Sequence, residues 1–166
     1  MSNIRERPLD RDVLAEFKSY SQKGLDLLGM SGATEPDDLV KAIDDFVDNW
    51  QNKRRGFLAK LGLRSGDPIE TALALGIVWG NQIVRRFDWS WVCLVTADGE
   101  RYAVVSPDRS LVIYATYFIK ECLDYTTADC TVLLAFNMQA ANKLAQEAPN
   151  EYASVMRSVR RIVPKR

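Results

Sequence analysis

The sequence predicts an α+β fold: N-terminal helices packed on an antiparallel sheet of three or four strands, with further helices at the C-terminus. Two observations support this class. Up to Phe87, hydrophobic residues recur every three or four positions, as on one face of a helix. After Phe87 they alternate with a period of two, as in strands. The 166 residues contain no linker or internal repeat, so we expect one domain, with helices over residues 10–87 and the sheet and C-terminal helices over residues 88–163.

Two helices are predicted in the first third of the chain. The first begins near Asp10, carries Phe17 on its apolar face, and loosens where the first glycines occur. The second has Thr34 as a candidate cap and Pro36 in its first turn. Residues 51–64 then form a short helix or a structured connector. The apolar stripe of the second helix consists of Leu39, Ile43, Phe46, Val47 and Trp50.

The strongest helix signal begins at Asp67. This residue is a capping type, Pro68 suits the first helical position, and Glu70 completes a capping box. Gly76 and Gly80 lie four residues apart on one face of this helix. Because a helical glycine costs about 1 kcal/mol relative to alanine, the pair predicts that another backbone packs closely against that face.

The sheet is predicted from residues 89 to 114. Alternating hydrophobic residues indicate a strand over residues 89–96, and Asp98-Gly99 is typical of a two-residue hairpin. The return strand covers residues 102–105. A Ser-Pro-Asp-Arg turn from Ser106 then leads to a third strand at residues 111–114, which completes an antiparallel meander.

The C-terminal part is predicted to be mainly helical. A helix runs through Leu123, with Thr116 as a candidate cap. Residues 131–136 are a short apolar run that fits either a strand or a buried helix, and we favour a fourth strand. A helix over residues 138–147 and a last one from Asn150 complete the prediction.

The composition excludes several kinds of catalytic site. The chain has no histidine, which removes Ser-His and Cys-His nucleophilic pairs and histidine-ligated metals. Cys93, Cys122 and Cys130 show no paired metal-binding spacing, and no phosphate-binding glycine loop occurs. We therefore predict no catalytic, metal-binding or cofactor-binding residues and expect no hydrolase activity.

The sequence also bears on the compartment. The N-terminus is polar, unlike a secretory signal, and no apolar run approaches the roughly 20 residues of a membrane helix. An odd number of cysteines suits a reducing compartment. We expect a cytoplasmic protein with no membrane partner.

Two charged segments are candidate binding surfaces. Residues 35–48 hold six acids against one base, which fits either a solvated helix face or a surface for a basic protein. The C-terminal bases could contact nucleic acid, but 22 basic residues balance 22 acidic ones overall, so nucleic acid is an unlikely partner. The acidic candidates are Asp37, Asp38, Asp44, Asp45 and Asp48, and the basic ones are Arg157, Arg160, Arg161, Lys165 and Arg166.

Three further side chains are candidates. Trp89 and Trp91 lie on one strand face, and they either cover the long helix or leave one ring exposed as an interface anchor. Arg109 in the Ser-Pro-Asp-Arg turn either contacts a ligand or reaches back to Glu70 or Asp67 and ties the turn to the long helix. We favour the tie to the helix.

Residues 70–138 resemble a family of small bacterial domains of unknown function. The resemblance consists of a Leu-Gly-x-x-Trp-Gly helix at residues 75–80, a tryptophan-bearing strand, a Ser-Pro-x-Arg-Ser-Leu turn at residues 106–111, and an aromatic residue, Tyr114. It implies an α+β fold and no particular chemistry. Immunity proteins, which neutralise bacterial toxins, are similar only in size and style.

These observations favour a non-catalytic protein-interaction domain of a bacterial cytoplasm, on the analogy of immunity proteins. The first alternative is a small-ligand binder or enzyme that uses Asp, Arg or Tyr in a pocket between helix and sheet. The second is a nucleic-acid accessory protein that uses a basic C-terminal helix. The partner would be another protein, and a homodimer also fits the sequence.

Overall fold

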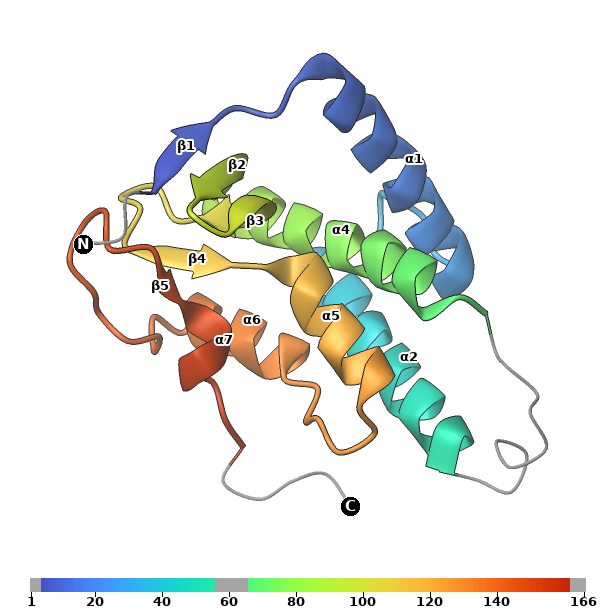
Figure 1. Cartoon of the computed structure of the whole chain (residues 1–166). Helices are drawn as coiled ribbons and strands as arrows, with labels where there is room; N and C mark the ends of the chain where they lie inside the picture. The colour runs from blue at the N-terminus through green and yellow to red at the C-terminus, as the bar shows by residue number, and fades with distance from the viewer. Residues whose placement is uncertain (1–3, 56–65, 162–166) are drawn as a thin grey trace.

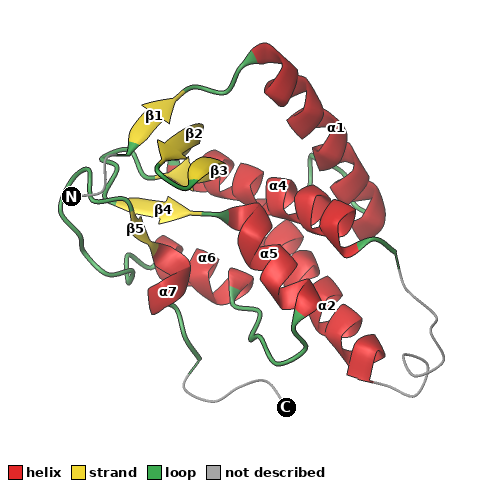
Figure 2. Ribbon diagram, viewed as in Figure 1, coloured by secondary structure: helices red, strands yellow, loops and turns green. Residues whose placement is uncertain are grey.

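A computed structural model describes residues 4–55 and 66–161 and confirms the α+β class (Figure 1). Apart from the short β1, three helices precede the central strands, and shorter helices follow them (Figure 2). The helices are α1 (Arg11–Leu28), α2 (Pro36–Arg55), α4 (Pro68–Phe87), α5 (Ala115–Asp124), α6 (Val132–Ala140) and α7 (Val155–Ser158). The strands are β1 (Arg5–Arg7), β2 (Ser90–Thr96), β3 (Gly99–Val105), β4 (Leu111–Ile113) and β5 (Ala153–Ser154).

The sheet has five strands in the order β1-β2-β3-β4-β5. The three central strands form the predicted antiparallel meander. β1 adds an antiparallel edge strand beside β2, and β5 adds a parallel edge strand beside β4. The prediction of three or four strands missed these edges because a strand of two or three residues is too short for an alternating pattern.

Helix α4 is the central element of the fold. It contacts α1, α2 and α5 as well as β2 and β3. Its predicted cap and first residue are confirmed: Pro68 begins the helix, and the Asp67 carboxylate accepts a hydrogen bond of 2.9 Å from the backbone N–H of Ile69. The predicted capping box is not, since the Glu70 carboxylate lies beside Lys23 of α1. Its side chains are buried nearly all round, including Leu75 and Trp79, as expected of a helix enclosed on several sides.

The two glycines of α4 allow two different close contacts. A Cβ atom added at Gly76 would lie 2.5 Å from the Cα of Thr116, so the predicted backbone contact is confirmed there. A Cβ atom added at Gly80 would lie 2.1 Å from the indole ring of Trp91. The prediction of a facing backbone is therefore wrong for Gly80, where a side chain fills the space.

Both faces of the sheet are buried. On one face, Val104 and Ile113 join the main core with the helices. The other face forms a second, smaller cluster, and Ile4, Tyr114 and Tyr152 pack against it. The buried residues of this second cluster are Val92, Leu94, Ala103, Val105 and Val112.

The C-terminal third differs most from the sequence prediction. Residues 132–140 form helix α6, so the fourth strand favoured at residues 131–136 is wrong. The helix predicted over residues 138–147 ends at Ala140, and the last predicted helix is replaced by β5 and the single turn α7. The conformation of each segment depends on packing against residues distant in the sequence, and the periodicity of a short window carries no information about them.

Smaller differences concern helix ends and turns. Helix α1 continues through Gly24, where an added Cβ atom would lie 2.6 Å from the carbonyl oxygen of Ala74. Tyr114 takes the capping position of α5 in place of Thr116, which lies within the helix. The hairpin turns one residue earlier than predicted, since Thr96 pairs with Gly99.

Two predictions fall on residues outside the described ranges. Of the connector at residues 51–64, only residues 51–55 are described, and they belong to α2. Lys165 and Arg166 of the basic tail also lie outside. Among the described helices, none has both the length and the apolar character needed to span a bilayer.

Candidate functional site

The Ser106–Leu111 turn is a closed hydrogen-bonded unit. The Asp108 carboxylate accepts hydrogen bonds from the Ser106 hydroxyl (2.7 Å), the Ser110 hydroxyl (2.8 Å) and the Ser110 backbone N–H (3.1 Å). These bonds, with that of Ser106 first, lower the pKa of Asp108. The serines and the aspartate of this motif are therefore satisfied within the turn.

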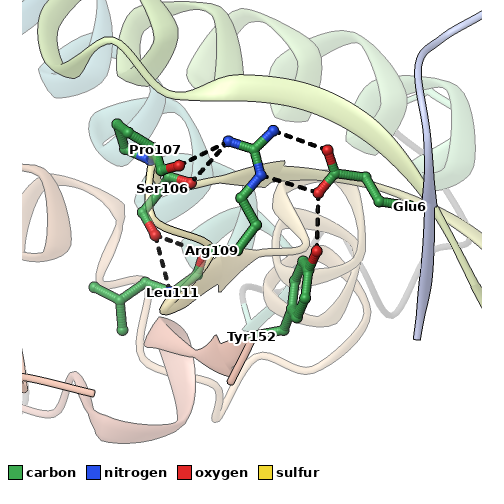
Figure 3. A network of polar contacts seen from close by, with 6 residues as sticks. All are labelled: Glu6, Ser106, Pro107, Arg109, Leu111 and Tyr152. Carbon is green, nitrogen blue, oxygen red and sulfur yellow. Dashed lines mark hydrogen bonds and ion pairs between the residues drawn. The ribbon is translucent and has the colours of Figure 1, made fainter. Parts of the chain in front are cut away.

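Arg109 leaves this turn toward β1. Its Nε and Nη2 atoms donate to the two carboxylate oxygens of Glu6 at 3.1 and 2.8 Å, and the Tyr152 hydroxyl donates to the same carboxylate at 3.0 Å (Figure 3). Arg109 Nη1 also donates to the carbonyl of Pro107 at 2.9 Å. The hydrogen bond from Arg109 lowers the pKa of Glu6. The network joins the turn to both edge regions of the sheet.

The predicted tie from Arg109 to Glu70 or Asp67 is therefore wrong in its partner. The turn lies at the far end of the molecule from the first turn of α4 (Figure 1). Glu70 instead lies 3.8 Å from the ammonium group of Lys23 in α1. Glu6 could not be foreseen because it lies in an edge strand that the sequence pattern does not reveal.

Replacing Arg109 by alanine is expected to lower the free energy of unfolding by about 1–3 kcal/mol, since the half-buried Glu6 carboxylate loses two hydrogen bonds. Chemical denaturation of Arg109→Ala, Glu6→Gln and the double variant measures the coupling, which we expect at about 0.5–3 kcal/mol. Glu70→Ala is the matched control and should show no coupling to Arg109.

This contribution also depends on pH. Because the pKa of Glu6 is lowered from 4.5, the pair stabilises the fold above that value and its contribution disappears as the pH falls through the lowered pKa. The difference in stability between the wild type and Arg109→Ala should therefore shrink in acid. A difference that is equal at pH 7 and in strong acid would contradict the ion pair.

The acidic candidates of α2 divide into two groups. Asp37, Asp38 and Asp45 are exposed and Asp48 is half-buried. Asp44 is only 1% exposed, so its assignment to an interaction surface is wrong. Asp44 is buried because it lies beside Ile43 on the face of α2 that packs against the core, and α2 also contacts α6.

Asp44 belongs to a buried charge cluster around Arg161. The guanidinium of Arg161, in a side chain 16% exposed, lies 3.6 Å from the Asp44 carboxylate and 2.6 Å from the Asp129 carboxylate. It also donates to the carbonyl of Cys130 at 2.7 Å. The cluster fixes the chain after α7 against α2 and the loop between α5 and α6.

The two candidate tryptophans pack on α4, as the structural alternative predicted. Trp89 is 3% exposed, so it is not an interface anchor. Trp91 is half-buried: its ring contacts Phe17 edge to face, and its indole N–H donates to Asn81 at 3.0 Å. Both tryptophans thus pack against other parts of the protein.

A groove with a volume of about 590 Å³ lies between α5 and the β5–α7 segment. We call it the α5–α7 groove. One wall is a face of α5, and the residues that line it are spaced three or four positions apart. The opposite wall comes from Ser154 to Arg160, and the loop between α5 and α6 forms one rim. The α5 wall consists of Tyr114, Tyr117, Phe118 and Glu121.

Hydrogen bonds from α2 hold the rim of the α5–α7 groove in place. The Gln51 side-chain amide donates to the carbonyl oxygens of Cys122 at 2.7 Å and Ala128 at 2.9 Å. Arg161 secures the same loop at Asp129. These contacts attach the rim to α2 at Ala128 and to the chain after α7 at Asp129.

Three arginines line the α5–α7 groove: Arg101, Arg157 and Arg160. Among the described residues, no carboxylate forms an ion pair with any of them. Burial raises the pKa of Tyr114, while the charges of Arg101 and Arg157 act in the opposite direction. The groove is therefore partly apolar, and its three arginines outnumber its two acids, Glu121 and Asp129, of which Asp129 is bound by Arg161.

The sequence does not reveal this groove as a unit. Its pattern predicts one basic helix from Asn150 that carries both Arg157 and Arg160, whereas α7 is a single turn that contains Arg157 and ends before Arg160. Arg101 and Tyr114 belong to the β3 region and the start of α5, and only the tertiary structure brings them beside these two arginines. A usable signal was the run of bases after Glu151 that contains no acid.

Comparison of the chain with known protein families, with curated proteins and with solved structures finds no match. The resemblance of residues 70–138 to small bacterial domains thus stays a prediction. The α5–α7 groove is therefore the candidate functional site.

Proposed function

We propose that the chain is a non-catalytic protein-interaction domain that holds an acidic segment of a partner protein in the α5–α7 groove. The observation that carries this proposal is the trio Arg101, Arg157 and Arg160, which line one groove without an ion-paired acid among the described residues. Excess positive charge at a groove favours a partner of opposite charge, both in steering and in specificity. The three cysteines of the chain are free thiols, which supports the bacterial cytoplasm, a reducing compartment, as the setting.

The lining suits a peptide with both acidic and apolar side chains. Arginine offers a planar fork that binds carboxylates through two hydrogen bonds. Phe118 and Met156 supply apolar surface between the charges, and Tyr117 is a large side chain that is 55% exposed. Aromatic residues and arginine are the residue types enriched at binding hot spots.

A small anionic molecule is the second candidate. Its support is the volume of the α5–α7 groove, about 590 Å³, which falls within the range of small-molecule sites. We favour the protein segment because Arg101, Arg157 and Arg160 are all exposed, so the positive charge lies along an open groove rather than around an enclosed cavity.

The proposal is tested by titrating an acidic pentapeptide with an aromatic centre into ¹⁵N-labelled protein. We expect backbone amide shifts to gather at residues 114–121 and 154–160. Loss of a hydrogen bond to a charged group costs about 1.5–3 kcal/mol, so Arg101→Gln and Arg157→Gln should each weaken binding about tenfold or more.

Arg86→Gln is the matched control, because Arg86 is an exposed arginine of α4 outside the groove. It should leave the affinity unchanged, and a basic peptide of equal length should not bind. Diffuse amide shifts, or an equal loss in the Arg86 variant, would show that the peptide responds to overall charge and would refute the proposal.

A further inference from the structure

The charges of the α5–α7 groove are distributed unevenly along its length. Arg101 lies over the ring of Tyr117, 5.7 Å from its centroid, and so belongs to the end near the first turn of α5. Arg157 and Arg101 both act electrostatically on Tyr114, the residue that precedes α5. Arg101, Tyr114 and Arg157 thus line the same groove, with both cations near one tyrosine.

The opposite end of the groove is close to neutral. Glu121 lies seven residues beyond Tyr114 on the same helix face, which is about 10 Å along the axis. Asp129 is bound by Arg161 at 2.6 Å. Arg160, the residue before Arg161, donates from its Nη1 atom to the carbonyl oxygens of Met156 and Val159 at 2.7 and 3.0 Å. With Glu121, which also lines the groove, the formal charges of these four side chains sum to zero.

We infer that the end of the groove formed by Arg101, Tyr114 and Arg157 is a site for a phosphate monoester carried by the bound segment. This inference rests on the proposed function and specifies its partner: a protein segment that bears a phosphorylated side chain. The neutral end of the groove receives the residues beside the phosphorylated one.

The chemistry of the site favours phosphate over carboxylate. A phosphate monoester carries close to two negative charges at neutral pH and three terminal oxygens, whereas a carboxylate has one charge and two oxygens. Two guanidinium groups match the dianion in charge, and each can donate two parallel hydrogen bonds to its oxygens. The hydroxyl of Tyr114, a half-buried residue of the same lining, supplies a further donor.

The inference is tested with three acidic pentapeptides that differ only at the centre, which carries serine, aspartate or phosphoserine. Dissociation constants are measured by calorimetry for the wild type and for four variants: Arg101→Gln, Arg157→Gln, Tyr114→Phe and Arg160→Gln. We expect the phosphoserine peptide to bind the wild type at least tenfold tighter than the aspartate peptide. The first two variants should abolish this preference, and Tyr114→Phe should reduce it.

Arg160→Gln is the control within the groove and should keep the preference for phosphoserine even where it weakens every peptide. Equal affinity for aspartate and phosphoserine would overturn the phosphate site and leave the proposed function standing. No binding of any peptide would refute the proposed function, and the phosphate site with it. Tighter binding of a short single-stranded oligonucleotide than of the phosphopeptide would overturn the inference in favour of a phosphodiester ligand.

Discussion

Gly76→Ala is expected to destabilise the protein by about 1–3 kcal/mol through overpacking, although alanine is the better helix former by about 1 kcal/mol. The added Cβ atom would lie 2.5 Å from the Cα and 2.8 Å from the backbone N of Thr116. Backbone atoms at the start of α5 cannot rotate aside as a side chain can. Helices α4 and α5 must therefore separate, and Gly76→Leu should prevent stable folding.

Chemical denaturation of Gly76→Ala beside Gly32→Ala provides the measurement. Gly32 is the matched control because its nearest contact, the Cδ1 atom of Leu25, lies 3.6 Å from an added Cβ atom. This variant should be close to the wild type in stability. An unchanged or raised midpoint for Gly76→Ala would show that α4 and α5 do not pack as closely as described.

Arg161→Met is expected to cost about 3–5 kcal/mol, the range for breaking a buried ion pair from one side. The substitution removes the cation that lies 3.6 Å from the buried Asp44 and 2.6 Å from Asp129. Methionine preserves most of the apolar contact of the arginine stem. The loss should therefore reflect charge and hydrogen bonding rather than packing.

The double variant Asp44→Asn/Arg161→Met separates charge from packing. Removing the acid as well as the base should restore part of the stability, with a coupling energy of about 1–3 kcal/mol. Additive losses would show that Asp44 and Arg161 act independently. Arg157→Met is the matched control, because that arginine is exposed and forms no ion pair among the described residues.

The Arg161 cluster also links the fold to the α5–α7 groove. It fixes the chain after α7 and the loop between α5 and α6, which provide one wall and one rim of the groove. Arg161→Met should therefore weaken peptide binding even where the protein stays folded. The ligand-facing variants Arg101→Gln and Arg157→Gln should weaken binding at unchanged stability, which distinguishes contact with the partner from support of the site.

The sequence by itself determined the helical first part, the central meander and the start of α4. These features depend on signals within a few residues of one another. Asp67 caps its own helix through the N–H of Ile69, and the alternation after Phe87 is a property of single strands. Gly76 likewise predicted a close contact, because a glycine destabilises a helix relative to alanine unless its small size is needed there.

Only the tertiary structure decided which residues face one another. The partner of Arg109 proved to be Glu6, 103 positions away, in a strand of three residues. Asp44 was predicted to lie on an acidic surface, yet it is buried, and its carboxylate lies 3.6 Å from the guanidinium of Arg161. The α5–α7 groove likewise combines Arg101, Tyr114 and Arg157 from three separate segments.

The physical reason is the range of the interactions. Caps, turns and periodic hydrophobic patterns act between residues close in the chain, so one sequence records them. Edge strands of two or three residues, short helices such as α7, and ion pairs across the molecule gain their stability from groups that only the folded chain brings together. The candidate site is made almost wholly of such contacts, and so it became visible only in the structure.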